Sequence, residues 1–174
     1  NDEGTQIIKY SFKPGQAVET IFDVNKAREC NFKRFNSYTF SPDGTKILIA
    51  TEKKPIYRRS YTAVHYVYTI ERNIVEPLSD NGPQQAPVFS PDGHMVAFVR
   101  DYNIFLVKFL YENSESQVTE DGELNKILNG IPDWVYEEEF AFNRALEFSA
   151  DSKMLAYIKF DESKVSSYSF PLYA

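Results

Sequence analysis

Three adjacent carboxylates in the string DWVYEEEF (133–140) are the residues of this sequence best suited to chemistry. Glu137, Glu138 and Glu139 repel one another, and partial enclosure by the aromatic residues around them would raise their pKa values unless a cation lay among them. The string therefore indicates either a solvated acidic turn or a site for a positive group: an amine, a guanidinium or a divalent metal. Calcium loops usually spread their oxygen ligands over alternating positions with a glycine between them, which this string lacks.

A second charged cluster, Arg58 and Arg59, lies in the string YRRSYTA (57–63). An arginine fork between two tyrosines suits recognition of a carbonyl or carboxylate oxygen, although such arginines are also common in surface salt bridges. The sequence contains no G-x-S-x-G string, and His65 and His94 occur outside any serine–histidine–acid pattern. We therefore expect both histidines to be structural or surface residues and no catalytic residue to lie in this chain.

One repeated unit organises the chain around these clusters. The strings YTFSPDGTKILIA, APVFSPDGHMVAFV and LEFSADSKMLAYI are three copies of it, marked by Phe40, Phe89 and Phe148. Each copy indicates a short strand, a tight turn and a second apolar strand, because proline and glycine in SPDG suit the second and last positions of a turn. The third copy keeps only Asp151 of these turn residues, and its assignment rests on the flanking pattern.

The first two copies continue into further β-rich runs, YTAVHYVYTI and NIFLVKF, each followed by a shorter one. Four strands in a repeat of about 45 to 50 residues are typical of a β-propeller blade. We therefore expect an all-β fold: a partial, open β-propeller of four-stranded antiparallel blades, with a short helical insertion near 133–141. The expected divisions are the end of one blade (about 1–35), two blades (36–82 and 83–122), and the acidic insertion with an incomplete blade (123–174). Because the run starts and stops within a blade, we expect it to be a piece of a longer protein.

Two insertions distinguish the repeats. The first holds TEKKPIYRRS (51–60), between the second and third strands of its blade, and the second holds DWVYEEEF, before the first strand of the next blade. In an up-and-down sheet these two kinds of connection open on the same face of the propeller, opposite the SPDG turns. Since elaborated loops on a rigid scaffold concentrate binding residues, we expect Arg58 and Arg59 on one loop and the three glutamates on the other to project from this face.

Composition limits the remaining function classes. The chain has 174 residues, 43% hydrophobic and 25% charged, with a net charge of −6 and no basic stripe, which argues against a nucleic-acid partner. No apolar run approaches the ~20 residues that cross a bilayer. Cys30 is the only cysteine, so no internal disulfide or cysteine metal site can form, and we expect it to be a small apolar residue.

The strings NGIPDWVYEEEF (129–140), LEFSADSKMLAYIKFDE (146–162) and YRRSYTA closely resemble the N-terminal β-propeller of dipeptidyl peptidase IV, in the prolyl oligopeptidase clan of serine peptidases. In that family the last two glutamates of the triplet bind the free α-amine of the substrate, and the loop arginine contacts the carbonyl of its first residue. The resemblance thus implies amine binding by Glu138 and Glu139 and carbonyl binding by Arg58.

The resemblance further implies that the parent protein is a serine-type enzyme releasing N-terminal Xaa-Pro or Xaa-Ala dipeptides, without metal or organic cofactor. Its triad would lie in a C-terminal α/β-hydrolase domain, absent here, so this segment alone should be inactive. The implied partners are peptides with a free N-terminus and that hydrolase domain; a homodimer is left open. The implied location is periplasmic, secreted or membrane-anchored and extracellular. The alternative is a non-enzymatic propeller that binds proteins through its acidic loop.

Overall fold

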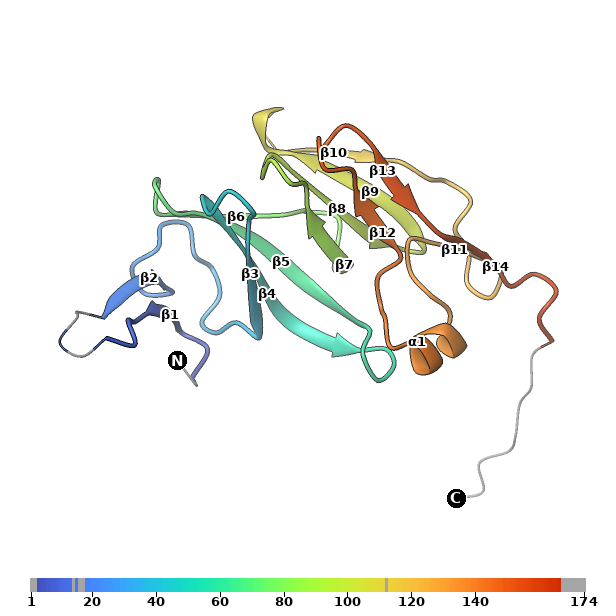
Figure 1. Cartoon of the computed structure of the whole chain (residues 1–174), viewed down its shortest axis with the longest axis horizontal. Helices are drawn as coiled ribbons and strands as arrows, with labels where there is room; N and C mark the ends of the chain where they lie inside the picture. The colour runs from blue at the N-terminus through green and yellow to red at the C-terminus, as the bar shows by residue number, and fades with distance from the viewer. Residues whose placement is uncertain (1–2, 14, 16–17, 112, 167–174) are drawn as a thin grey trace, which may run out of the picture.

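The computed structural model describes residues 3–13, 15, 18–111 and 113–166. Antiparallel strands dominate it, and the sheets follow one another along the molecule in chain order, from the first hairpin to the last (Figure 1). The first sheet is a hairpin of β1 (Gln6–Lys9) and β2 (Glu19–Asp23). Among the described residues none of the sheets closes on itself, so the expectation of an all-β, open arrangement is confirmed.

Two four-stranded antiparallel units follow the hairpin. The first consists of β3 (Ser37–Phe40), β4 (Lys46–Pro55), β5 (Tyr61–Thr69) and β6 (Ile74–Pro77). The second consists of β7 (Gln84–Phe89), β8 (Met95–Arg100), β9 (Asn103–Lys108) and β10 (Ser114–Gln117), with a 3-10 turn at Phe109–Tyr111. The sequence does not indicate one feature of this arrangement: β5 pairs with both β6 and β7, so that the two units form a single eight-stranded sheet.

The last unit is shorter. It consists of β11 (Ile127–Asn129), α1 (Trp134–Phe140), β12 (Leu146–Phe148), β13 (Leu155–Tyr157) and β14 (Lys159–Asp161). Strand β12 pairs with β13, and β11 pairs with β14. The expected short helix near 133–141 is thus present, whereas the end of the expected incomplete blade (123–174), residues 167–174, lies outside the described residues.

The cores lie between neighbouring units, because successive side chains of a strand point to opposite faces. In β8, Val96 and Phe98 pack toward the first four-stranded unit, while Ala97 and Val99 pack toward the last one. Burial on both faces explains why the second strand of the first two repeats, in β4 and β8, is apolar without interruption.

The three repeat turns form the same hydrogen bonds. In the first, the Ser41 hydroxyl donates to Asp43 over 2.6 Å and accepts from the Lys46 amide over 2.9 Å. Ser90 and Ser149 form the corresponding bonds in the second and third copies. In the third copy, Ser152 stands where the first two copies have glycine. Its φ of 61° is left-handed, like the 69° of Gly44. The third copy is therefore the same turn although its proline and glycine are missing.

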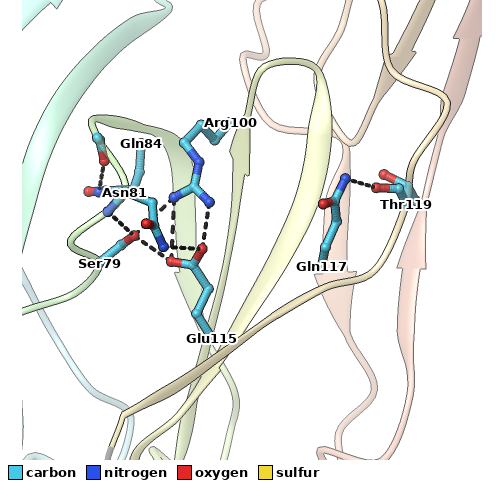
Figure 2. A network of polar contacts seen from close by, with 8 residues as sticks. Ser79, Asn81, Gln84, Arg100, Glu115, Gln117 and Thr119 are labelled. Atoms are coloured by element: carbon cyan, nitrogen blue, oxygen red, sulfur yellow. Dashed lines mark hydrogen bonds and ion pairs between the residues drawn. The ribbon is translucent and has the colours of Figure 1, made fainter.

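A half-buried polar network, separate from the two charged clusters, stabilises the second unit (Figure 2). Arg100 donates to Glu115 over 2.5 Å, and Ser79 and Asn81 also donate to this carboxylate. Burial alone would raise the pKa of Glu115, but the hydrogen bonds, from Arg100 first, hold it below its usual range. The Arg100 guanidinium also lies 4.1 Å from the centre of the Phe105 ring. Because these groups satisfy one another, we interpret the network as structural.

Candidate functional site

The acidic string forms helix α1, whose ends are set by its flanking residues. Asp133 is the N-cap, and its Oδ1 accepts a hydrogen bond from the Tyr136 amide over 2.8 Å. Ala141 ends the helix in the left-handed region, and its amide donates to the Glu137 carbonyl. The Tyr136 ring packs edge-on against Phe160 of β14, at 5.0 Å between centres. The helix is thereby fixed to the last unit of the fold.

The three glutamates lie in three different environments. Glu137 is buried, with 1% of its surface exposed, and its Oε1 accepts hydrogen bonds from two backbone amides, of Arg59 at 2.7 Å and Ser60 at 2.9 Å. Glu138 is half-buried, and Glu139 is exposed to solvent. Three consecutive residues of a helix span about 200° around its axis, so they cannot share one face. The triplet therefore supplies one inward carboxylate and two that remain accessible.

The arginine cluster lies in a tight loop, residues 56–60, which we call the Arg loop. It joins β4 to β5 and is closed by a hydrogen bond from the Ile56 amide to the Ser60 carbonyl over 2.9 Å. Much of the first insertion is strand rather than loop, because β4 extends to Pro55 and pairs there with Tyr61. In the next unit, by contrast, Arg100 pairs directly with Asn103 across a two-residue turn. The insertion thus moves Arg58 outward along an extended hairpin.

The Arg loop and α1 are in contact, as expected for two insertions that open on one face. The Arg58 Nε donates to Glu138, with distances of 2.9 Å to Oε2 and 3.2 Å to Oε1. The Asn143 side-chain amide, which follows the helix, donates to the Arg59 carbonyl over 2.9 Å. Figure 1 shows the β4–β5 connection beside α1. Residues about 80 positions apart in sequence therefore form one site.

Arg58 and Arg59 contribute differently to this site. The Arg58 side chain is 71% exposed and reaches the Glu138 carboxylate, which is 23% exposed. Arg59 takes part through its backbone, with its amide on Glu137 and its carbonyl on Asn143. Sequence reasoning predicted that Arg58, Glu138 and Glu139 belong together, but it missed the contacts of Glu137 and Asn143. Neither residue carries a sequence signal for them, because each contact depends on a segment distant in the chain.

A cavity of 490 Å³ adjoins the site and is lined by Tyr57 and Ser60 of the Arg loop, by Asp133 and Trp134 at the start of α1, and by Glu162, among others. Burial, together with neighbouring acidic groups of which Glu162 is the first, raises the pKa of the Tyr57 hydroxyl. That hydroxyl is therefore neutral at physiological pH and able to donate a hydrogen bond.

The remaining candidates of the sequence have structural environments. His65 is buried in β5, where its Nδ1 lies 3.0 Å from the Gln84 side-chain oxygen, and burial lowers its pKa to about 4. Cys30 is half-buried, and burial raises the pKa of its thiol. Among the residues that the structure describes, no group of histidine, cysteine and acidic side chains could hold a metal ion. No helix in that part of the chain is long and apolar enough to cross a membrane.

Comparison with known proteins identifies the family of this arrangement. The model of the dipeptidyl peptidase IV (DPP IV) N-terminal region matches residues 41–174, well over half of the chain. The chain belongs to this family. The resemblance to the N-terminal region of dipeptidyl peptidase IV, seen in three strings of the sequence, is thus confirmed.

A solved structure supports the same family assignment. The crystal structure of Porphyromonas gingivalis dipeptidyl peptidase 4 superposes with a TM-score of 0.93 at 49% identity and covers 99% of this chain. The probable dipeptidyl peptidase 4 of Arthroderma benhamiae is 38% identical over 99% of the chain, and the probable dipeptidyl-aminopeptidase B of Colletotrichum graminicola is 37% identical over 74% of it. The chain spans only 23% of the Arthroderma protein and 25% of the Porphyromonas chain. The open propeller expected from the repeats is confirmed by this structural match.

Proposed function

We propose that this segment of a DPP IV family protein binds the free α-amine of a peptide substrate through Glu138 and Glu139 and the carbonyl of its first residue through Arg58. The observation that carries the proposal is the meeting of the two insertions: Arg58 lies on Glu138, and Glu139 is the next residue on the same short helix. Of the triplet, these two carboxylates are the ones that a ligand can reach, because Glu137 is buried.

The chemistry of a peptide N-terminus suits this arrangement. An α-amine has a reference pKa of about 7.7 to 8.0, so it is largely protonated at neutral pH, and nearby carboxylates raise that pKa further. An ammonium group has three N–H donors, and two carboxylates can accept hydrogen bonds from them at once. A guanidinium beside one of them gives the site a donor for the adjacent carbonyl oxygen.

Holding the terminus also sets the position of cleavage. An extended residue spans at most about 3.3 to 3.6 Å, so the bond after the second residue lies roughly 7 Å from the bound amine. A nucleophile placed there releases dipeptides rather than internal fragments. We propose that the whole protein is a serine-type dipeptidyl peptidase preferring Pro or Ala at the second residue, with its nucleophile in a C-terminal hydrolase domain. The names of the relatives, which are dipeptidyl peptidases, support this activity. We propose that the whole protein acts on periplasmic or extracellular peptides.

The test uses the whole protein with a chromogenic Xaa-Pro substrate, Gly-Pro-p-nitroanilide, and its N-acetylated form. Glu138→Ala or Glu139→Ala should lower kcat/KM for the free-amine substrate by at least about a hundredfold, since a charge-assisted pair is lost. The acetylated substrate should be cleaved poorly by the unaltered protein and no worse by the variants.

A matched control is Glu123→Ala, because Glu123 is an exposed glutamate paired with Lys126 outside the site. It should leave kcat/KM unchanged. Equal cleavage of the free and acetylated substrates, or full activity in both glutamate variants, would rule out amine binding by this helix.

A further inference from the structure

We infer that Glu137, assisted by Asn143, is a positioning residue that fixes the Arg loop against α1 and so places the Arg58 guanidinium. The inference rests on the proposed function and extends it to a residue that does not touch the substrate. It assigns separate tasks within the triplet: Glu138 and Glu139 bind the ligand, while Glu137 holds the segment that supplies Arg58.

The burial of Glu137 is the first observation. A carboxylate with 1% of its surface exposed is costly unless hydrogen bonds compensate for lost hydration. Two backbone amides of the Arg loop provide this compensation, both on Oε1. Hydrogen bonds to a buried charge are stronger than those between neutral groups, and losing the acceptor would leave two amides without partner.

The position of the bonds along the loop is the second observation. The Arg59 amide belongs to the peptide unit that joins Arg58 to Arg59, and the Ser60 amide belongs to the next unit. Glu137 thus holds both peptide units that flank Arg59, and Asn143 holds the carbonyl of the second one. With the first unit fixed, the Cα atom of Arg58 is fixed as well, so its side chain starts from a set position beside α1.

The ion pair between Arg58 and Glu138 cannot hold the Arg loop against α1. The Arg58 side chain is 71% exposed, and exposed ion pairs contribute little to stability, because the entropy lost in ordering the side chain offsets much of the gain. The backbone bonds to Glu137 are short and shielded from water, so they determine where the loop lies. Arg58 then needs to order only its own side chain when a ligand arrives.

The test measures kcat and KM of the whole peptidase on Gly-Pro-p-nitroanilide, with melting temperature recorded for every variant. Glu137→Ala should lower kcat/KM about tenfold, mainly through KM, because the guanidinium is no longer held in place. Glu137→Gln, which keeps an oxygen acceptor, should stay within about threefold of the unaltered protein. Asn143→Ala breaks only the hydrogen bond to the Arg59 carbonyl, so its loss of kcat/KM should lie between those of the two Glu137 variants.

A double-mutant cycle with Arg58→Ala separates positioning from a general loss of structure. If Glu137 acts through Arg58, adding Glu137→Ala to Arg58→Ala should cost less than about twofold more, since the positioned group is already gone. Multiplied losses in the double variant, or an unchanged kcat/KM in Glu137→Ala, would overturn the inference. Full activity in Glu138→Ala and Glu139→Ala would instead remove the proposed function itself, so the two failures are distinguishable.

Discussion

The two ends of the strands in this molecule carry connections of opposite character. At one end lie the three repeat turns, whose shared hydrogen bonds join residues at most five positions apart, with one further bond from the Asp92 amide to the Ser152 hydroxyl between two turns. At the other end lie the Arg loop and α1, whose mutual hydrogen bonds join residues 77 to 84 positions apart. One end is closed locally, whereas the other exists only when two distant segments meet.

This difference separates stability from binding. The turn end repeats the same short-range hydrogen bonds in each copy, so substitutions there should alter folding and leave activity intact. The insertion end carries long charged side chains near solvent, so substitutions of Arg58, Glu138 and Glu139 should alter activity more than folding. Three experiments sharpen or break this contrast.

The largest effect is expected from acid, and it falls on the strands between the two ends. The pKa of His65 is lowered to about 4 from an ordinary 6.5 by burial, so below pH 6.5 the unfolded state binds a proton that the folded state does not. Stability is therefore lost as pH falls from about 6.5 to 4, by up to about 3 kcal/mol. Melting temperatures of the unaltered protein and His65→Gln across this range measure it, and parallel curves for the two proteins would refute it.

The turn end should resist the same acidification. Burial would raise the pKa of Asp43, but hydrogen bonds from Ser41 and Thr45 lower it to about 2. A lowered carboxyl pKa gives stability that is present above the unfolded value and is lost only as pH falls toward 2. The strands should therefore weaken before the turns do.

The second effect is a pair of glycine substitutions at equivalent turn positions. Both Gly44 and Gly93 have left-handed φ values, so alanine costs each about 1 kcal/mol of strain. A Cβ on Gly44 meets open space, whereas one on Gly93 would lie 2.6 Å from the Asp43 carboxylate of the neighbouring turn. Gly93→Ala should therefore destabilise by at least about 2 kcal/mol, roughly twice the effect of Gly44→Ala.

Calorimetry of the propeller transition would compare the two glycine variants, with kcat/KM of the folded protein as the second readout. Equal melting temperatures would show that the turns do not pack on one another. A fall in kcat/KM at either position would break the separation of the two ends.

The smallest effect in free energy is expected from the two neighbouring arginines. Arg58→Ala should lower kcat/KM for Gly-Pro-p-nitroanilide about tenfold, because the carbonyl donor is lost. Arg59→Ala keeps the backbone amide and carbonyl that Glu137 and Asn143 hold, so its loss should be under about twofold. Both variants should have the same melting temperature as the unaltered protein. A larger loss at Arg59 would mean that the carbonyl contact belongs to the wrong arginine.

The repeat made much of the fold predictable from the sequence. The SPDG pattern predicts the hairpins, and the hydroxyl of Ser149 explains why the third copy folds alike without proline or glycine. The double pairing of β5 could not be predicted, because it depends on how far β4 and β5 extend beyond the shared repeat length.

The site was predictable to the level of segments rather than atoms. Strand alternation and connection type place the Arg loop and α1 on one face from sequence alone. Which glutamate turns inward depends on the rotation of α1 about its axis, which Asp133 and the packing of Tyr136 on Phe160 determine. No property of three identical adjacent residues could indicate that choice.

The shortness of α1 has a consequence for protein engineering. Seven residues are fewer than the roughly 12 to 15 that a helix needs to persist alone in water, so a synthetic peptide carrying DWVYEEEF would be a disordered acidic chain. Grafting that string onto another scaffold would likewise transfer its charge without its geometry. A functional transplant requires the hairpin arm 51–64 together with 133–145, presented by a host whose strands hold them at the same separation. The portable unit is thus a pair of segments and not a linear motif.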